Sequence, residues 1–210
     1  MSHIVLLGDS IFDNRAYVAP DPDVIHQLRG RLGRDWTATL LAVGGHVTDD
    51  VRTRQLARLP QDATQLVISV GGNDALGRSA ILHEPARSVG EAVGRLAQAQ
   101  ASFVDGYANM LDAVLALGLP TAVCTIYDAN YPEPQRQVVV AALALFNDAI
   151  SRAAFGRGLP LVDLRLICSD PADYANPIEP SAMGGSKIAS VIAALVQGDG
   201  AAQRSTVWAH

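Results

Sequence analysis

The chain has 210 residues, 49% of them hydrophobic, and a formal net charge of −5. This length is ample for one domain with a sizeable core. Lys187 is the only lysine, and the arginines are scattered singly along the chain. With no basic stripe in the sequence, we do not expect nucleic acid to be a partner.

The sequence also gives expectations about membranes, location and redox chemistry. No uninterrupted apolar run approaches the ~20 residues that span a bilayer, so we expect no membrane partner. The N-terminus has no basic region before a long apolar stretch, which favours a cytoplasmic protein. Cys124 and Cys168 are too few and too far apart for a disulfide framework or a zinc site.

The first part of the chain alternates short apolar runs with helical periodicity. Residues 4–7 predict a buried strand, which Gly8-Asp9-Ser10 ends with turn-forming residues. The next predicted elements, in chain order, are a helix over 24–32, a strand over 36–43, a short helix over 48–59, a strand over 65–71 and an irregular loop over 75–86.

In the second part, helical spacing continues from Ser88 to about Gly118. Gly90 and Gly94 weaken it by about 1 kcal/mol each, so we expect one long helix or two separated by a kink. Then follow a strand over 121–126, a helix over 135–156, a strand over 160–164 and a helix over 183–196.

This alternation predicts an α/β domain with a parallel sheet and helices on both faces. We expect one domain over residues 1–197, and a loose tail over 198–210, where no periodicity is present.

Three polar or glycine motifs follow predicted strands. Ser10 follows the first, Gly45 lies in the stretch G-G-H-V-T after the second, and Asn73 lies in G-G-N-D after the third. The carboxyl ends of parallel strands form the ligand-binding edge of an open α/β sheet. If a helix follows Ser10, its free N–H groups face the same place. That setting suits a nucleophile whose attack creates an oxyanion.

These motifs resemble the SGNH (GDSL-type) hydrolase family, from about residue 4 to about residue 196. The resemblance implies a three-layer α/β/α sandwich with a five-stranded parallel sheet in the flavodoxin-like order 2-1-3-4-5. It also implies that Ser10 is the nucleophile, and that the N–H groups of Ser10 and Gly45 and the side chain of Asn73 form an oxyanion hole. Gly45 fits the family's G-x-x-T better than Gly44 does.

The last block departs from the family. The family places Asp-x-x-His before its final helix, with the histidine as general base, whereas this chain has Asn176 and Glu179 there. The flanking P-S and G-G-x-K-I-A match, which fixes the alignment. A glutamate base is already anionic, and an asparagine amide can donate a hydrogen bond to it, whereas an aspartate would raise its pKa by repulsion. We therefore expect Glu179 to be the base, held by Asn176.

Other interpretations stay open. Glu179 is an ordinary exposed residue if the chain has lost catalysis, and His46, or less favourably His83, reaches Ser10 if a histidine serves as base. Asp9 is expected as a turn former. Three further residues are expected on loops at the rim of the pocket: Asp74, Tyr127 and Asp128. A metal site from Asp9, Asp128 and Glu179 has no supporting ligand spacing, so neither a metal nor a cofactor is expected.

The sequence thus predicts a serine esterase or acylhydrolase acting on a small-molecule ester, with catalytic residues Ser10, Gly45, Asn73, Glu179 and Asn176. No segment reads as a dedicated lid, so a long lipid substrate is not favoured. The alternative is a catalytically inactive protein of the same fold that binds a small ligand or a covalent acyl group.

Overall fold

Five parallel strands form the centre of the protein. In the computed structural model, which describes residues 1–198 and 207, these strands lie in the order β2-β1-β3-β4-β5. Their bounds are β1 Ser2–Gly8, β2 Trp36–Leu40, β3 Gln65–Ser69, β4 Thr121–Cys124 and β5 Leu161–Val162. The expected α/β/α class and strand order are confirmed. Most of the predicted tail, 198–210, lies outside the described residues.

The side chains of β1 alternate between two separate cores, as they must in a strand covered on both faces. Ile4 and Leu6 belong to one cluster of buried apolar residues, and Val5 and Leu7 to another. All four are fully buried. The uninterrupted apolar run 4–7 is therefore a central strand.

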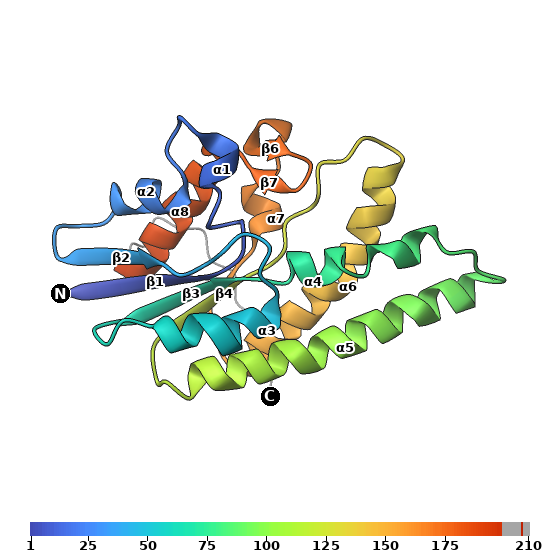
Figure 1. Ribbon diagram of the computed structural model, residues 1–210, viewed down its shortest axis with the longest axis horizontal. Coiled ribbons are helices and arrows are strands. Elements are labelled where there is room, and N and C mark those ends of the chain that lie inside the picture. Colours follow the sequence, from blue (N-terminus) through green and yellow to red (C-terminus); the bar gives the residue numbers. More distant parts are fainter. Residues whose placement is uncertain (199–206, 208–210) are drawn as a thin grey trace.

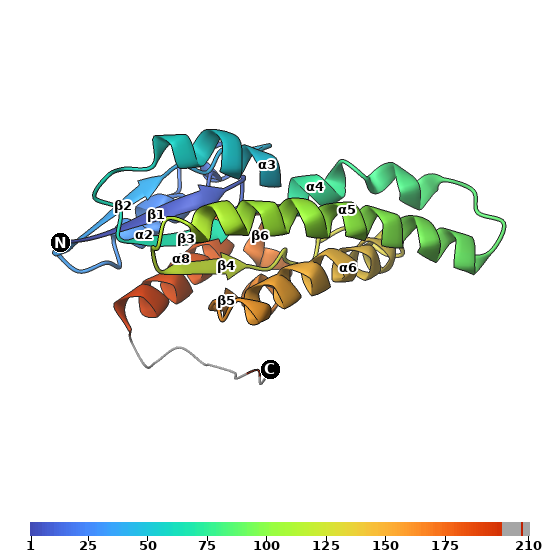
Figure 2. The same cartoon turned by 90° about the horizontal axis from the view of Figure 1, so that it is seen from below.

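Different helices cover the two faces of the sheet, and the two longest lie on the same face (Figures 1 and 2). The face that carries Ile4 and Leu6 packs against α2 (Val24–Arg29), α7 (Leu164–Ile167) and α8 (Ala182–Gln197). The opposite face packs against α5 (Val89–Leu115), α6 (Gln135–Gly156) and one continuous helical segment. That segment consists of α3 (Thr48–Asp50), η1 (Val51–Gln55, a π-helical turn) and η2 (Leu56–Arg58).

Short elements connect these layers. They are α1 (Arg15–Val18), α4 (Gly72–Leu76), η3 (Ser79–His83), η4 (Pro171–Asp173) and the antiparallel hairpin of β6 (Tyr174–Asn176) and β7 (Glu179–Pro180). Two differences from the sequence analysis follow. The expected irregular loop over 75–86 contains the end of α4 and all of η3, and the segment before the last helix forms a hairpin.

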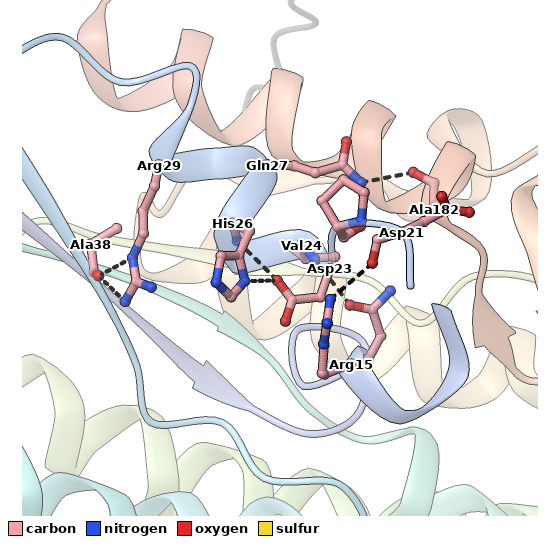
Figure 3. Close-up of polar contacts among 11 residues, drawn as sticks. Arg15, Asp21, Asp23, Val24, His26, Gln27, Arg29, Ala38 and Ala182 are labelled. Carbon is pink, nitrogen blue, oxygen red and sulfur yellow. Dashed lines mark hydrogen bonds and ion pairs between the residues drawn. The ribbon is translucent and has the colours of Figure 1, made fainter. Parts of the chain in front are cut away.

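Side-chain-to-backbone hydrogen bonds fasten α2 to its neighbours (Figure 3). The Arg29 guanidinium donates to the carbonyl of Ala38 in β2 at 3.0 and 2.8 Å. Gln27 donates to the carbonyl of Ala182 at the start of α8, at 2.8 Å. The helix thus links the edge strand to the end of the chain that carries residue 179.

The two longest helices reach past the sheet. The amino-terminal parts of α5 and α6 lie beyond the carboxyl ends of the strands, together with α4 and η3 (Figures 1 and 2). α5 is one helix despite Gly90 and Gly94. Asn147 of α6 accepts from the N–H of Ile126 and donates to its carbonyl, both at 2.8 Å, which fixes α6 where β4 ends.

The helix α6 is apolar overall, although polar residues interrupt its apolar run. By length and composition alone this helix is able to cross a membrane. An 18-residue segment of it has a mean hydropathy of 1.6, and 28% of that segment is buried inside the protein. Its buried residues all lie in its second half: Phe146, Asn147, Ala149, Ile150 and Ala154. That half packs in the core next to α5, whereas the first half, beyond the sheet, is largely exposed.

Candidate active site

Ser10 lies in a tight turn at the carboxyl end of β1. Gly8 pairs with Ser69 of β3, and its φ is 131°, a conformation that favours glycine. A Cβ there would lie 1.8 Å from the Ser69 carbonyl oxygen. The carboxylate of Asp9 accepts from the N–H of Ile11 at 3.1 Å, which tightens the turn. Ser10 is thereby held at the edge of the sheet, 8% exposed.

The turn after Ser10 does not continue into a long helix. The next helix, α1, has four residues and begins at Arg15. No long helix therefore directs its free N–H groups at Ser10 directly after β1. In this turn the N–H groups of Phe12 and Asp13 both donate to the carbonyl of Asp9. The Ser10 N–H has no acceptor among the described residues, so it remains a free donor.

The hairpin of β6 and β7 places Glu179. Its neighbouring carbonyls are both anchored: Ile178 accepts from the Tyr127 hydroxyl at 2.6 Å, and Pro180 accepts from the Asn14 amide at 3.3 Å. Glu179 is consequently 6% exposed, and its Oε2 has no hydrogen-bond partner among the described residues. A buried carboxylate oxygen without a partner is uncommon in a protein.

Glu179 faces Ser10 and Tyr17. Burial raises the pKa of Glu179 above its ordinary value, and the negative charge of Asp13 adds to the rise. The hydroxyls of Ser10 and Tyr17 favour the charged form and so lower this pKa, which offsets part of the effect of burial. No hydrogen bond joins the Glu179 side chain to either hydroxyl by full geometric criteria among the described residues.

Asn176 is not brought to Glu179 in the expected way. The two residues pair in the hairpin, but the Asn176 side chain is exposed and its Oδ1 accepts from the N–H of Ile178 at 2.9 Å. It closes a local turn and makes no side-chain hydrogen bond to Glu179 within the described part of the chain. The hydroxyl that faces Glu179 beside Ser10 belongs instead to Tyr17.

The loop after β2 lies beside Ser10. A Cβ on Gly44 would lie 3.9 Å from the Ser10 Cβ. The Gly44 N–H is taken by the Asp13 carboxylate at 2.9 Å, whereas the N–H of Gly45 (φ 83°) has no acceptor among the described residues. Of the two glycines, Gly45 is therefore the one with a free donor.

Asn73, in α4, is tied to the same loop. Its Nδ2 donates to the carbonyl of His46 at 2.9 Å, which leaves the second amide hydrogen for another acceptor. The loop is also fixed to α4 by Thr48, whose N–H and hydroxyl both donate to Asp74 at 3.0 Å. The G-x-x-T and G-G-N-D motifs are thus joined by direct hydrogen bonds.

Neither candidate histidine is hydrogen-bonded to Ser10 in the described residues. His46 accepts at Nδ1 from Gln55 at 2.9 Å. Gln55 is almost fully buried and also bonds both the N–H and the carbonyl of Gly8, at 2.8 and 2.7 Å. His83 is exposed, in η3.

Two further carboxylates lie near the site. Asp9 is 3% exposed, and burial raises its pKa to about 7, with the charges of Glu179 and Asp74 adding to the rise. Burial also raises the pKa of Asp74. Asp9, Asp128 and Glu179 do not form a metal-binding group in the described residues.

A cavity of about 210 Å³ opens beside Ser10. Ser10, Asn73 and Glu179 line it, with Asp9 and Tyr127. Sequence reasoning missed the roles of Tyr17, Asn14 and the hairpin, because none of them carries a local pattern that indicates a site.

Comparison with known proteins identifies the family. Residues 6–184 match the model of the GDSL-like lipase/acylhydrolase family. No curated protein sequence matches the chain.

Several solved structures share the fold. An extracellular lipase from Streptomyces rimosus is 18% identical, with a TM-score of 0.68 over 94% of this chain and 99% of that one. A lipase from a goat rumen metagenome is 15% identical, with a TM-score of 0.69 over 90% and 95%. A carbohydrate acetylesterase from Sinorhizobium meliloti is 13% identical, with a TM-score of 0.65 over 94% and 99%. With most of its length matched by the family model, this chain belongs to the GDSL-like lipase/acylhydrolase family, the SGNH hydrolases.

Proposed function

We propose that the protein hydrolyses small carboxylic esters, with Ser10 as nucleophile and Glu179 as general base. The observation that carries this proposal is the buried Glu179 carboxylate facing the Ser10 hydroxyl. Its Oε2, which has no hydrogen-bond partner among the described residues, is available to take a proton. Membership of a family of lipases and acylhydrolases supports the reaction class.

In the first half-reaction the Ser10 Oγ attacks the ester carbonyl carbon while Glu179 takes the hydroxyl proton. The carbonyl oxygen becomes an oxyanion. Three donors are free to bind it: the N–H groups of Ser10 and Gly45 and the second amide hydrogen of Asn73. Each such donor typically contributes about 10²–10³-fold in rate.

The tetrahedral intermediate collapses when its bond to the alcohol oxygen breaks. Glu179 returns the proton to that oxygen, so the alcohol leaves neutral and the acyl group stays on Ser10. Water then attacks the acyl carbon while Glu179 takes a proton from it, and a second tetrahedral intermediate forms. The bond between the acyl carbon and Ser10 Oγ breaks as Glu179 returns the proton to Oγ, so the carboxylic acid leaves and Ser10 is regenerated. One base serves both halves, as in other serine hydrolases.

Burial compensates in part for the weakness of a carboxylate base. An ordinary glutamate has a pKa near 4.3, about two units below histidine, and transfers protons poorly at neutral pH. The raised pKa of Glu179 brings it closer to the range in which a base works well. Because only the ionised form accepts a proton, activity should rise with pH through this raised pKa.

Labelling with a fluorophosphonate tests the nucleophile without requiring the substrate to be known. We expect the parent to be labelled and Ser10→Ala not to be. A folded parent that resists labelling would favour the alternative, a binding protein of the same fold.

Hydrolysis of p-nitrophenyl acetate tests the base. Glu179→Gln should lower kcat by about 10²–10⁴-fold, the usual contribution of a general base, and should remove the acidic limb of the pH profile. His46→Ala and His83→Ala are the matched controls and should keep that limb. A limb that survives in Glu179→Gln and vanishes in His46→Ala would assign the base to His46 instead.

A further inference from the structure

The buried side chain of Gln55 connects the two segments that carry the free backbone donors. Its Oε1 accepts from the N–H of Gly8 at 2.8 Å, and its Nε2 donates to the carbonyl of Gly8 at 2.7 Å and to Nδ1 of His46 at 2.9 Å. Gln55 is 1% exposed, and these bonds use the oxygen and both hydrogens of its amide. One amide thus joins the turn of Ser10 to the loop of Gly45.

The sheet is irregular where Gln55 meets it. At the end of β2 the N–H groups of Leu41 and Ala42 both donate to the carbonyl of Leu6, at 2.9 and 3.0 Å. This doubling takes the chain out of register with β1. At Gly8, the last residue of β1, the acceptor of the N–H is the side chain of Gln55 instead of a neighbouring strand.

A π-helical turn places this side chain. In η1 the N–H of Leu56 donates to the carbonyl of Val51, five residues earlier. Val51 and Gln55, the first and last residues of η1, are both buried, so the turn directs the amide at β1 and not at solvent. Single π-helical turns are frequent at functional sites.

His46 is held from two sides. Its carbonyl accepts from the amide of Asn73 at 2.9 Å, and its Nδ1 accepts from Gln55. Because the N–H of Gly8 fixes the oxygen of the Gln55 amide, the nitrogen of that amide faces His46. Nδ1 is therefore the ring nitrogen without a hydrogen, and Nε2 carries the hydrogen of the neutral ring.

We propose that Gln55 is a positioning residue for the oxyanion hole, which fixes the spacing between the N–H groups of Ser10 and Gly45. Ser10 lies two residues after Gly8, and Gly45 directly precedes His46, so a shift of either anchor moves a donor. Such donors need to be held within about 0.5 Å of the productive geometry. The inference rests on the proposed function and adds to it a residue that does not line the cavity.

Gln55→Met is the test variant, because it keeps the length of the side chain and removes its amide. With p-nitrophenyl acetate it should lower kcat by about 10- to 100-fold, less than the ~10²–10³-fold effect of removing a whole donor. KM should change by less than about twofold, since the lost interaction acts in the transition state. The acidic limb of the pH profile should stay in place, because Glu179 is untouched. An unchanged kcat, or a shift of that limb, would overturn the inference.

Thr64→Val is the matched control at the opposite end of β1. The Thr64 hydroxyl accepts from the N–H of His3 at 2.8 Å and donates to its carbonyl at 3.2 Å, so it too bonds both backbone groups of one β1 residue. This variant should lose stability in urea but keep kcat within about twofold, since His3 lies far from the donors along the strand. Equal losses of kcat in Thr64→Val and Gln55→Met would mean that Gln55 serves stability alone.

His46→Ala provides the test if Gln55→Met does not fold. It removes one of the three bonds of the Gln55 amide and keeps the backbone carbonyl that accepts from Asn73. We expect kcat to fall by about three- to tenfold, the equivalent of one ordinary hydrogen bond, with the acidic limb retained. A kcat equal to that of the parent would contradict the proposed role of Gln55.

Nitrogen NMR of the histidine rings separates this inference from the proposed function. At pH 8 the parent should show His46 with its hydrogen on Nε2 alone, and Gln55→Met should show a mixture of both tautomers; a hydrogen on Nδ1 in the parent would overturn the inference. If this signature is present but no ester is hydrolysed, the Gln55 contact stands and the proposed function fails. Hydrolysis that depends on Glu179, with the same kcat in Gln55→Met, keeps the proposed function and overturns the role of Gln55.

Discussion

At the scale of single residues, the polar group that faces Glu179 besides the Ser10 hydroxyl belongs to Tyr17 and not to Asn176. Its hydroxyl faces the Glu179 carboxylate, and the Glu179 charge raises the pKa of Tyr17 in return. A neutral donor beside a carboxylate base stabilises its charged form without adding a second negative charge. In the mechanism that we propose, Tyr17 stabilises the charged form of the Glu179 base by this contact.

Replacing this hydroxyl gives a residue-scale prediction. In Tyr17→Phe, loss of the donor should raise the pKa of Glu179 further, so the acidic limb of the pH–rate profile should move to higher pH. Because Tyr17 is 44% exposed, water replaces part of the lost interaction, and we expect a shift of about 0.5–1 pH unit.

The pH–rate profile for a small ester measures that shift, with Tyr131→Phe as the control. Tyr131 also lines the cavity, but it is not among the groups that shift the pKa of Glu179. Identical profiles for the parent and Tyr17→Phe would mean that Tyr17 does not act on the base.

At the scale of elements, the cavity beside Ser10 depends on where α6 meets the sheet. Asn147 holds both backbone groups of Ile126, the second residue after β4. Asn147 is 1% exposed, and both hydrogen bonds are partly buried. This double hydrogen bond aligns the amino-terminal half of α6 with the cavity.

Asn147→Leu should therefore destabilise the fold. It leaves the partly buried N–H and carbonyl of Ile126 without partners. A fully buried unsatisfied group costs about 1–3 kcal/mol, and because these two are only partly buried we expect a loss of about 2–4 kcal/mol in the free energy of unfolding, the lower part of the summed range. Urea denaturation measures it. Asp148→Leu, next along the helix and exposed, is the control and should change stability by less than about 0.5 kcal/mol.

At the scale of the whole molecule, three carboxylates near Ser10, the buried Asp9 and Glu179 and the partly buried Asp74, make the folded state bind protons more tightly than the unfolded chain does. The pKa values of Asp9, Asp74 and Glu179 are all raised, mainly by burial, and that of Asp9 reaches about 7. Stability should consequently be lost as pH rises from the unfolded value near 4 through the folded value near 7. The site is maintained at the expense of stability at neutral pH.

Asp9→Asn isolates this effect, since the amide oxygen of asparagine can still accept from the N–H of Ile11. At pH 8 the variant should be more stable than the parent by about 2–4 kcal/mol. The upper end of this range is the free energy that corresponds to the rise of about three units in the pKa of Asp9. At pH 4 the difference should disappear. Urea denaturation at both pH values measures it, and an equal difference at both would show that ionisation of Asp9 is not its source.

The sequence by itself determined the class, the strand order through family resemblance, and the positions of Ser10, Gly45 and Asn73 at strand ends. These features follow from local chemistry. An apolar run such as 4–7 ends where glycine and turn residues follow, and parallel strands bring their carboxyl ends to one edge. Helix 135–156 was placed correctly for the same reason, because its apolar periodicity is continuous.

Only the tertiary structure decided what surrounds Glu179 and how far the cavity extends. Tyr17 and Glu179 are 162 residues apart in the chain, and no spacing rule connects them. Asn176 has the right chemistry to hold Glu179, but its oxygen forms a nearer bond to Ile178 within its own turn. The extent of the cavity likewise depends on how far α5 and α6 reach beyond the sheet. Phe103 and Asn147 fix the two helices at the ends of β3 and β4. Periodicity gives the lengths of two helices, but only packing between distant segments fixes where each one lies along the sheet.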